Sequence, residues 1–132
     1  MTTPPTLRVV AREKNWMAFA QLLDAAMAEP PRYGLSDAGA VRAAVARLRR
    51  QQPSSLVPAM KAMEYLRERR PEVLERAEAP VGCAQVRLLA RLAELAPEAA
   101  AAVEDRVLRG EVRGADLRAM IETETRRTAD NA

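Results

Sequence analysis

The sequence predicts an all-α protein, a compact bundle of about six short helices that includes helix-turn-helix-like pairs. Ala, the strongest helix former, accounts for 27 of the 132 residues. Only 3% of the residues are aromatic, which argues against a β-sandwich or β-barrel. Apolar residues also recur at helical spacing in several segments. Together these observations favour a helical domain with a modest core.

The length suits a single domain, which we expect over residues 14–125. Residues 1–13 contain two prolines and no periodic pattern, so they are expected to form a flexible arm. The domain divides by charge into a basic half over 14–80 and a second helical half over 82–125. The polar residues 126–132 are expected to form a frayed tail.

A first helix is expected to begin at Trp16. Its apolar side chains recur at helical spacing and form one stripe: Trp16, Phe19, Ala20, Leu23 and Met27. Pro30 and Pro31 then end this helix, because proline lacks the amide hydrogen that a helix interior requires.

Two basic helices follow, over residues 36–51 and 54–70. Ser36 is a suitable N-cap for the first of them, and Ser54 or Ser55 for the second. Pro53 lies in the turn that separates them. Their expected inner positions are all apolar: Val41, Ala44, Val45, Leu48, Leu56, Met60, Met63 and Leu66.

Four further helices are expected after residue 70. Pro71 suits the first position of a short one, and Pro97 opens another that ends at Gly110. Between them, a helix over about 84–95 carries a wide apolar stripe, and a last helix follows a turn at 111–114. The expected inner residues of the 84–95 helix and of the last helix are all apolar: Val86, Leu88, Leu89, Leu92, Leu95, Leu117, Met120 and Ile121.

The most basic segment runs from residue 42 to residue 70, where eight Lys or Arg residues face only Glu64 and Glu68. Such an excess attracts polyanions, and a basic helix-turn-helix can enter the major groove of DNA. The chain has 19 Arg and two Lys, and Arg suits bidentate phosphate recognition. The expected contact residues on this face are Arg42, Arg47, Arg49, Arg50, Lys61, Tyr65 and Arg69.

Two alternatives explain the same residues without a ligand. Basic side chains near helix C-termini complement the helix dipole. A GC-rich coding sequence would also enrich both Ala and Arg.

A resemblance comes from residues 82–121. The run VRLLARLAELAPE over residues 86–98 resembles the recognition helix and following loop of ParB-type partition proteins, and GEVRGADLRAM over 110–120 is similar to their next helix pair. The resemblance implies DNA binding, with Gln85, Arg87 and Arg91 facing outward as reading residues.

The chain departs from the family pattern at two places. Ala115-Asp116 stands where the family has Gly-His, and the family's Arg-rich nucleotide-binding motif is absent, so CTP binding is not expected. The alternative is that this half, with eight Arg and nine acidic residues in 82–132, is a helical packing or dimerisation unit.

No catalytic or metal site is expected. The chain has no His, the commonest general base and metal ligand, and its single thiol, Cys83, has no His partner. The five Gly residues form no phosphate-binding loop. Glu104 and Asp105 are expected to pair with Arg109 along their own helix. We therefore expect no enzyme activity, no cofactor and no bound metal.

The N-terminal residues lack the charged and apolar regions of a secretory signal, and no apolar run approaches the ~18 residues of a membrane span. A cytoplasmic protein without membrane contact is expected. The sequence thus predicts a small DNA-binding regulatory or partition-accessory protein, as a homodimer that presents two half-sites. The alternative is a helical protein-interaction module, an adaptor or anti-activator, that binds a protein partner through amphipathic helices.

Overall fold

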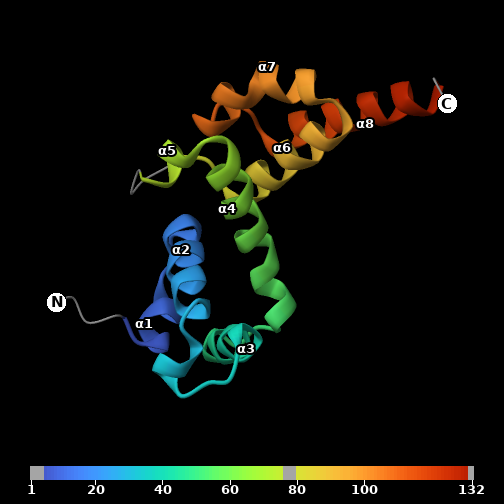
Figure 1. Ribbon diagram of the computed structural model, residues 1–132. Coiled ribbons are helices and arrows are strands. Elements are labelled where there is room, and N and C mark those ends of the chain that lie inside the picture. The colour runs from blue at the N-terminus through green and yellow to red at the C-terminus, as the bar shows by residue number, and fades with distance from the viewer. Residues whose placement is uncertain (1–4, 76–79, 131–132) are drawn as a thin grey trace. The chain divides into compact units, whose positions relative to one another are not determined.

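The computed structural model describes residues 5–75 and 80–130, and within these ranges it contains eight α-helices, two 3₁₀ helices and no strand. The all-α prediction is confirmed. In chain order (Figure 1) the elements are α1 (Leu7–Arg12), α2 (Trp16–Met27), η1 (Pro30–Tyr33), α3 (Ala38–Leu48), η2 (Pro53–Leu56), α4 (Val57–Arg69), α5 (Pro71–Leu74), α6 (Cys83–Leu95), α7 (Pro97–Leu108) and α8 (Gly114–Asp130).

The chain forms two compact units, Met1–Met63 and Glu64–Ala132, where the sequence predicted one domain over 14–125. The division falls inside α4 and does not coincide with the predicted boundary near residue 81. The first unit contains nine Lys or Arg and four Asp or Glu, a net charge of +5. The second contains twelve Arg and fourteen acidic residues, a net charge of −2.

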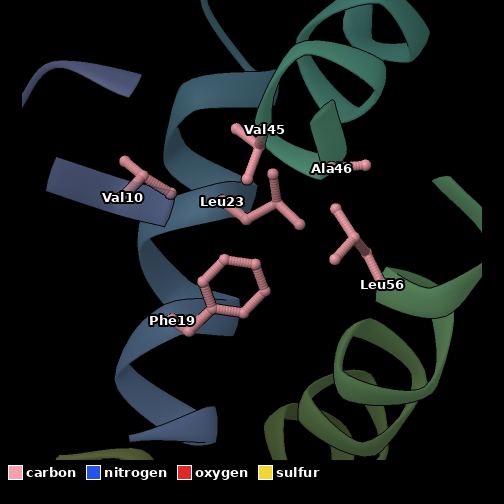
Figure 2. Packing of buried hydrophobic residues seen from close by; sticks show 6 residues of the cluster. All are labelled: Val10, Phe19, Leu23, Val45, Ala46 and Leu56. Atoms are coloured by element: carbon pink, nitrogen blue, oxygen red, sulfur yellow. The ribbon is translucent and has the colours of Figure 1, made fainter. Parts of the chain in front are cut away.

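The core of the first unit is built from α1, α2, α3 and η2. Figure 2 shows the six side chains that converge from these four elements: Val10, Phe19, Leu23, Val45, Ala46 and Leu56. The apolar spacing of α2 accounts for two of them, since Phe19 and Leu23 lie one turn apart on its buried face. Burial of this apolar surface is the main force that holds the four short elements together.

The predicted flexible arm over 1–13 is wrong for Leu7–Arg12, which forms α1; residues 1–4 lie outside the described part of the chain. Thr6 caps the helix, because its Oγ1 accepts a hydrogen bond of 3.3 Å from the amide of Val9. Val10 is completely buried in the core of the first unit. Leu7, Val10 and Ala11 stand at helical spacing, but six residues are too few to form a stable helix alone, so the tertiary contact stabilises α1.

α3 begins two residues later than predicted. Its N-cap is Asp37, whose Oδ1 accepts a 2.7 Å hydrogen bond from the amide of Ala40, and Ser36 is exposed. Leu48, expected on the inner face, is 45% exposed. The predicted caps Ser54 and Ser55 both lie within η2, and α4 starts only at Val57.

In the second unit, α6 packs against both α7 and α8. Val86, Leu89 and Leu92 are fully buried on α6, as its apolar stripe predicts, whereas Leu95 is exposed near the end of the helix. Gly110 follows the C-cap of α7 with a φ of 76°, a left-handed conformation that glycine adopts without strain.

α8 continues to Asp130, so the predicted frayed tail over 126–132 is wrong up to that residue; 131–132 lie outside the described residues. Ion pairs one turn apart, Glu122–Arg126 and Glu124–Arg127, support this exposed end of the helix.

Arg70 connects the start of α5 to α7. Its Nη1 pairs with Glu104 at 3.3 Å and with Asp105, and its Nε pairs with Glu72 at 2.6 Å. The hydrogen bond from Arg70 lowers the pKa of Asp105 below its ordinary value. The predicted pairing of Glu104 and Asp105 with Arg109 is therefore wrong, and Arg109 pairs with Glu111 at 3.3 Å.

Replacing Arg70 by Ala is expected to destabilise the protein at neutral pH, because two α7 carboxylates lose their partner. Since the pKa of Asp105 is lowered in the folded state, this stabilisation is present above the ordinary Asp pKa of about 3.9 and is lost as the pH falls through the folded-state value. The urea midpoint of R70A should lie below that of the wild type by a constant amount between pH 7 and pH 5.

That difference should shrink as the pH approaches 3. The matched control is R106A, which removes an exposed arginine of α7 that forms no ion pair among the described residues, and it should change the midpoint little. An R70A deficit that does not depend on pH would contradict this account of Asp105.

Candidate functional site

Arg49 joins the ends of two helices in the first unit. Its backbone caps the C-terminus of α3, while its Nη1 donates hydrogen bonds to the carbonyl oxygens of Ala11 at 3.0 Å and Glu13 at 3.3 Å. These carbonyls lie at the end of α1, where the last turn of a helix has no intrahelical donors. One guanidinium therefore satisfies the end of α1 and holds it beside the end of α3.

Two further contacts fix the same side chain. The guanidinium carbon of Arg49 lies 4.1 Å from the centre of the Phe19 ring, within the range of a cation–π interaction. Its Nε donates to Oε1 of Gln51 at 3.2 Å. The prediction that Arg49 faces outward to contact DNA is therefore corrected: it is half-buried, and its hydrogen bonds are used within the fold. The sequence could not show this, because the partner helix lay in the segment expected to be an arm.

Five other cations surround this junction, each within three residues of Ala11, Glu13 or Arg49. They are all exposed, and none forms an ion pair within residues 5–75 and 80–130: Arg8, Arg12, Lys14, Arg47 and Arg50. We refer to these five residues as the α1–α3 basic surface. Arg47 and Arg50 were predicted as contact residues, whereas Arg8, Arg12 and Lys14 were not.

Among the described residues, no acidic side chain of the first unit forms an ion pair with this surface. Glu13 accepts a hydrogen bond from the amide of Asn15 at 3.1 Å, and Glu29 pairs with Arg32 at 2.8 Å. Asp37 is occupied as the N-cap of α3, and Asp24 also has a partner. Hydrogen bonds from backbone amides leave the charges of Glu13 and Asp37 in place, but nine cations face four acids in the first unit, so an excess of positive charge is available to a ligand.

Arg50 occupies a position where glycine is usual. Its φ is 58°, in the left-handed region, and it stands immediately after the C-cap of α3. The Arg50 amide donates to the Arg47 carbonyl at 3.0 Å and the Gln51 amide donates to the Ala46 carbonyl at 2.9 Å, the pattern of a Schellman motif. A side chain here costs about 1 kcal/mol relative to glycine. An arginine kept at this cost marks a position where its charge is a candidate for function.

The remaining residues predicted on the basic helix pair are divided between the two units. Arg42 and Lys61 belong to the first; Lys61 is exposed, whereas Arg42 is half-buried and its Nε has no hydrogen-bond partner among the described residues. Tyr65 and Arg69 belong to the second, where the Arg69 guanidinium lies 5.4 Å from the Tyr65 ring centre. Burial raises the pKa of Tyr65. The predicted basic face of the helix pair is therefore divided, with Arg42 and Lys61 in the first unit and Tyr65 and Arg69 in the second.

On α6, Arg87 and Arg91 are exposed one turn apart, as predicted. Gln85 differs from the prediction: it is half-buried, and its side-chain amide lies so close to Gly82 that a Cβ there would clash with it. Gln85 therefore covers the start of α6 and does not face outward as a reading residue. The absence of a side chain at Gly82 is what allows this arrangement.

The described residues contain no group of three His, Cys, Asp or Glu side chains that could hold a metal ion. Burial raises the pKa of the Cys83 thiol, with Arg87 acting in the opposite direction. A thiol with a raised pKa is mostly protonated at neutral pH and is a poor nucleophile. Within the part of the chain that the structure describes, no helix is long and apolar enough to cross a membrane.

Comparisons with protein-family models, with curated proteins and with solved structures find no match to this chain. The functional argument therefore rests on the charges and geometry of its own side chains. The α1–α3 basic surface is the candidate site, because its five cations lie near the ends of two helices, are exposed, and have no ion-pair partner among the described residues.

Replacing Arg49 by Ala should lower the free energy of unfolding by about 1.5–3 kcal/mol, the range for hydrogen bonds to a charged group. The carbonyls of Ala11 and Glu13 would lose their donor. Replacing Arg49 by Lys should lose less stability than R49A but still some, since an ammonium cannot reproduce the planar guanidinium fork.

Urea unfolding followed by circular dichroism measures both variants. R47A, at an exposed position two residues away, is the control and should stay within about 0.5 kcal/mol of the wild type; equal losses in R49A and R47A would refute the structural role.

Proposed function

We propose that this protein is a small DNA-binding regulatory or partition-accessory protein, and that it binds DNA phosphates through the α1–α3 basic surface. The observation that carries this proposal is the group of five exposed cations at the junction of two helices, unpaired among the described residues, in a unit of net charge +5. Contacts between such cations and phosphates dominate the affinity of many DNA-binding proteins. Four of the five are Arg, whose fork matches the phosphate oxygens.

The second unit would supply sequence reading. The resemblance of residues 82–121 to ParB-type partition proteins supports a role for α6 at the DNA, and Arg87 and Arg91 stand exposed one turn apart on that helix. Arginine is the commonest residue that reads guanine in the major groove. In a homodimer, two such helices would meet two half-sites of one operator.

Replacing Arg47 and Arg50 together by Ala should weaken binding to every duplex and reduce its salt dependence. The slope of log K against log salt should become shallower by about 0.9 for each phosphate that the variant no longer neutralises, or about 1.8 for both. Fluorescence anisotropy with labelled duplexes over a salt series measures this.

The matched control is R126A/R127A, which removes the same charge from α8 of the second unit. Equal effects of the two double variants would mean that net charge alone, and not the α1–α3 basic surface, determines binding. A wild-type protein that binds no duplex even at low salt would refute DNA binding itself.

A helical protein-interaction module is the second candidate, and a groove in the second unit favours it. The groove lies between α7 and α8 and has a volume of about 460 Å³. Small and apolar side chains of Ala99, Ala119 and Met120 line it, together with the carboxylates of Glu111 and Asp116. Arg106 also lines the groove, and Glu111 and Asp116 are already paired with Arg109 and Arg113. The apolar side chains of the groove, and not its charges, would therefore bind the apolar face of a partner helix.

Replacing Ala119 by Trp should fill this groove without removing any charge. If the protein acts as an adaptor, A119W should lose a partner protein that copurifies with the wild type, while R47A/R50A should retain it. Co-purification followed by size-exclusion chromatography distinguishes these results. Retention of the partner by A119W would contradict docking in the groove.

A further inference from the structure

The α1–α3 basic surface contains a defined hollow. Arg8, Ala11 and Arg12 of α1 and Leu48 of α3 line it, with a volume of about 230 Å³. Arg8 and Arg12 lie one turn apart on the exposed side of α1, and Leu48 supplies an apolar wall that is 45% exposed. None of the described residues that line the hollow is acidic.

The backbone around this hollow is fixed. Val10, between the two arginines in sequence, is completely buried in the core, and Leu7 and Ala11 pack against the same core. The Arg49 guanidinium holds the end of α1 beside the end of α3, next to Leu48. The two arginines therefore extend from a helix whose position relative to Leu48 is set by the fold, which reduces the ordering cost of binding.

We infer that this hollow holds one phosphodiester group of a nucleic-acid strand. This inference rests on the proposed DNA binding. The guanidinium groups of Arg8 and Arg12 would donate to the two non-bridging oxygens of the phosphodiester, and Leu48 would contact the carbons of the adjoining sugar. The volume lies below the roughly 300 Å³ at which pockets for small-molecule ligands begin, so the hollow suits a single charged group. The described residues that line it include no aromatic side chain, the usual platform on which a base stacks.

An anionic lipid carries the same phosphodiester, but the surface favours a nucleic acid. α1 has only six residues, and its one large exposed apolar side chain is Val9, at 50% exposure. Helices that lie in a membrane interface bury a broad apolar face, which this short helix does not offer.

The decisive variant is R8K/R12K, which retains both charges and removes both guanidinium forks. Its affinity for a duplex at moderate salt should fall about tenfold, because a Lys ammonium contacts phosphate as a point charge and cannot form the bidentate pair of a guanidinium. The matched control R126K/R127K makes the same exchange on α8 of the second unit, outside the α1–α3 basic surface, and should change the affinity less than about twofold. Urea unfolding of each variant verifies that the fold is intact.

A second measurement does not depend on DNA. Titration with dimethyl phosphate, followed by NMR, should shift the amide signals of Arg8, Arg12 and Leu48 in the wild type, and R8A/R12A should abolish these shifts. If the wild type binds duplex DNA and R8K/R12K binds equally well, the hollow is not a phosphate site, while the proposed function stands. If vesicles containing phosphatidylglycerol bind and duplex DNA does not, the nucleic-acid assignment is overturned, and so is the proposed function. Absence of local shifts in the wild type would also overturn the phosphate site.

Discussion

The first unit depends on the interaction of Arg49 with the end of α1. An isolated helix of six residues is not stable in water, so α1 exists only through its tertiary contacts. Val10 anchors its buried side, and the Arg49 guanidinium satisfies two carbonyls at its C-terminal end. The same interaction places Arg8 and Arg12 next to Leu48. A side chain that is part of the fold therefore organises the exposed side chains that we propose for binding.

Most of the fold was predictable from the sequence where elements are long and clearly bounded. The apolar period of α2 and α6, the prolines that open α5 and α7, and Gly110 after α7 all act over a few neighbouring residues, and the structure retains them. The division into two units could not be predicted, because it falls within the continuous helix α4. It depends on which segments share a core, and local composition does not carry that information.

The candidate site was predictable only in part. Charge density identified Arg47 and Arg50, and both are exposed. Charge density failed for Arg49, and the family resemblance failed for Gln85, because long polar side chains reach partners that the sequence does not place beside them. Arg8 and Arg12 were missed with the rest of α1, although Thr6 followed by apolar residues at 7, 10 and 11 is a short cap-and-stripe pattern.

The two units differ in how far acidic residues balance their arginines. Arginine is frequent in both units, so a coding bias that enriches arginine would not by itself explain the difference in net charge between them. That difference lies in the acidic residues, four in the first unit and fourteen in the second. Arg70 and Arg109 illustrate the second unit, where carboxylates neutralise them. In the first unit the cations around Arg49 have no such partners within the described residues, and an external phosphate would supply the missing negative charge.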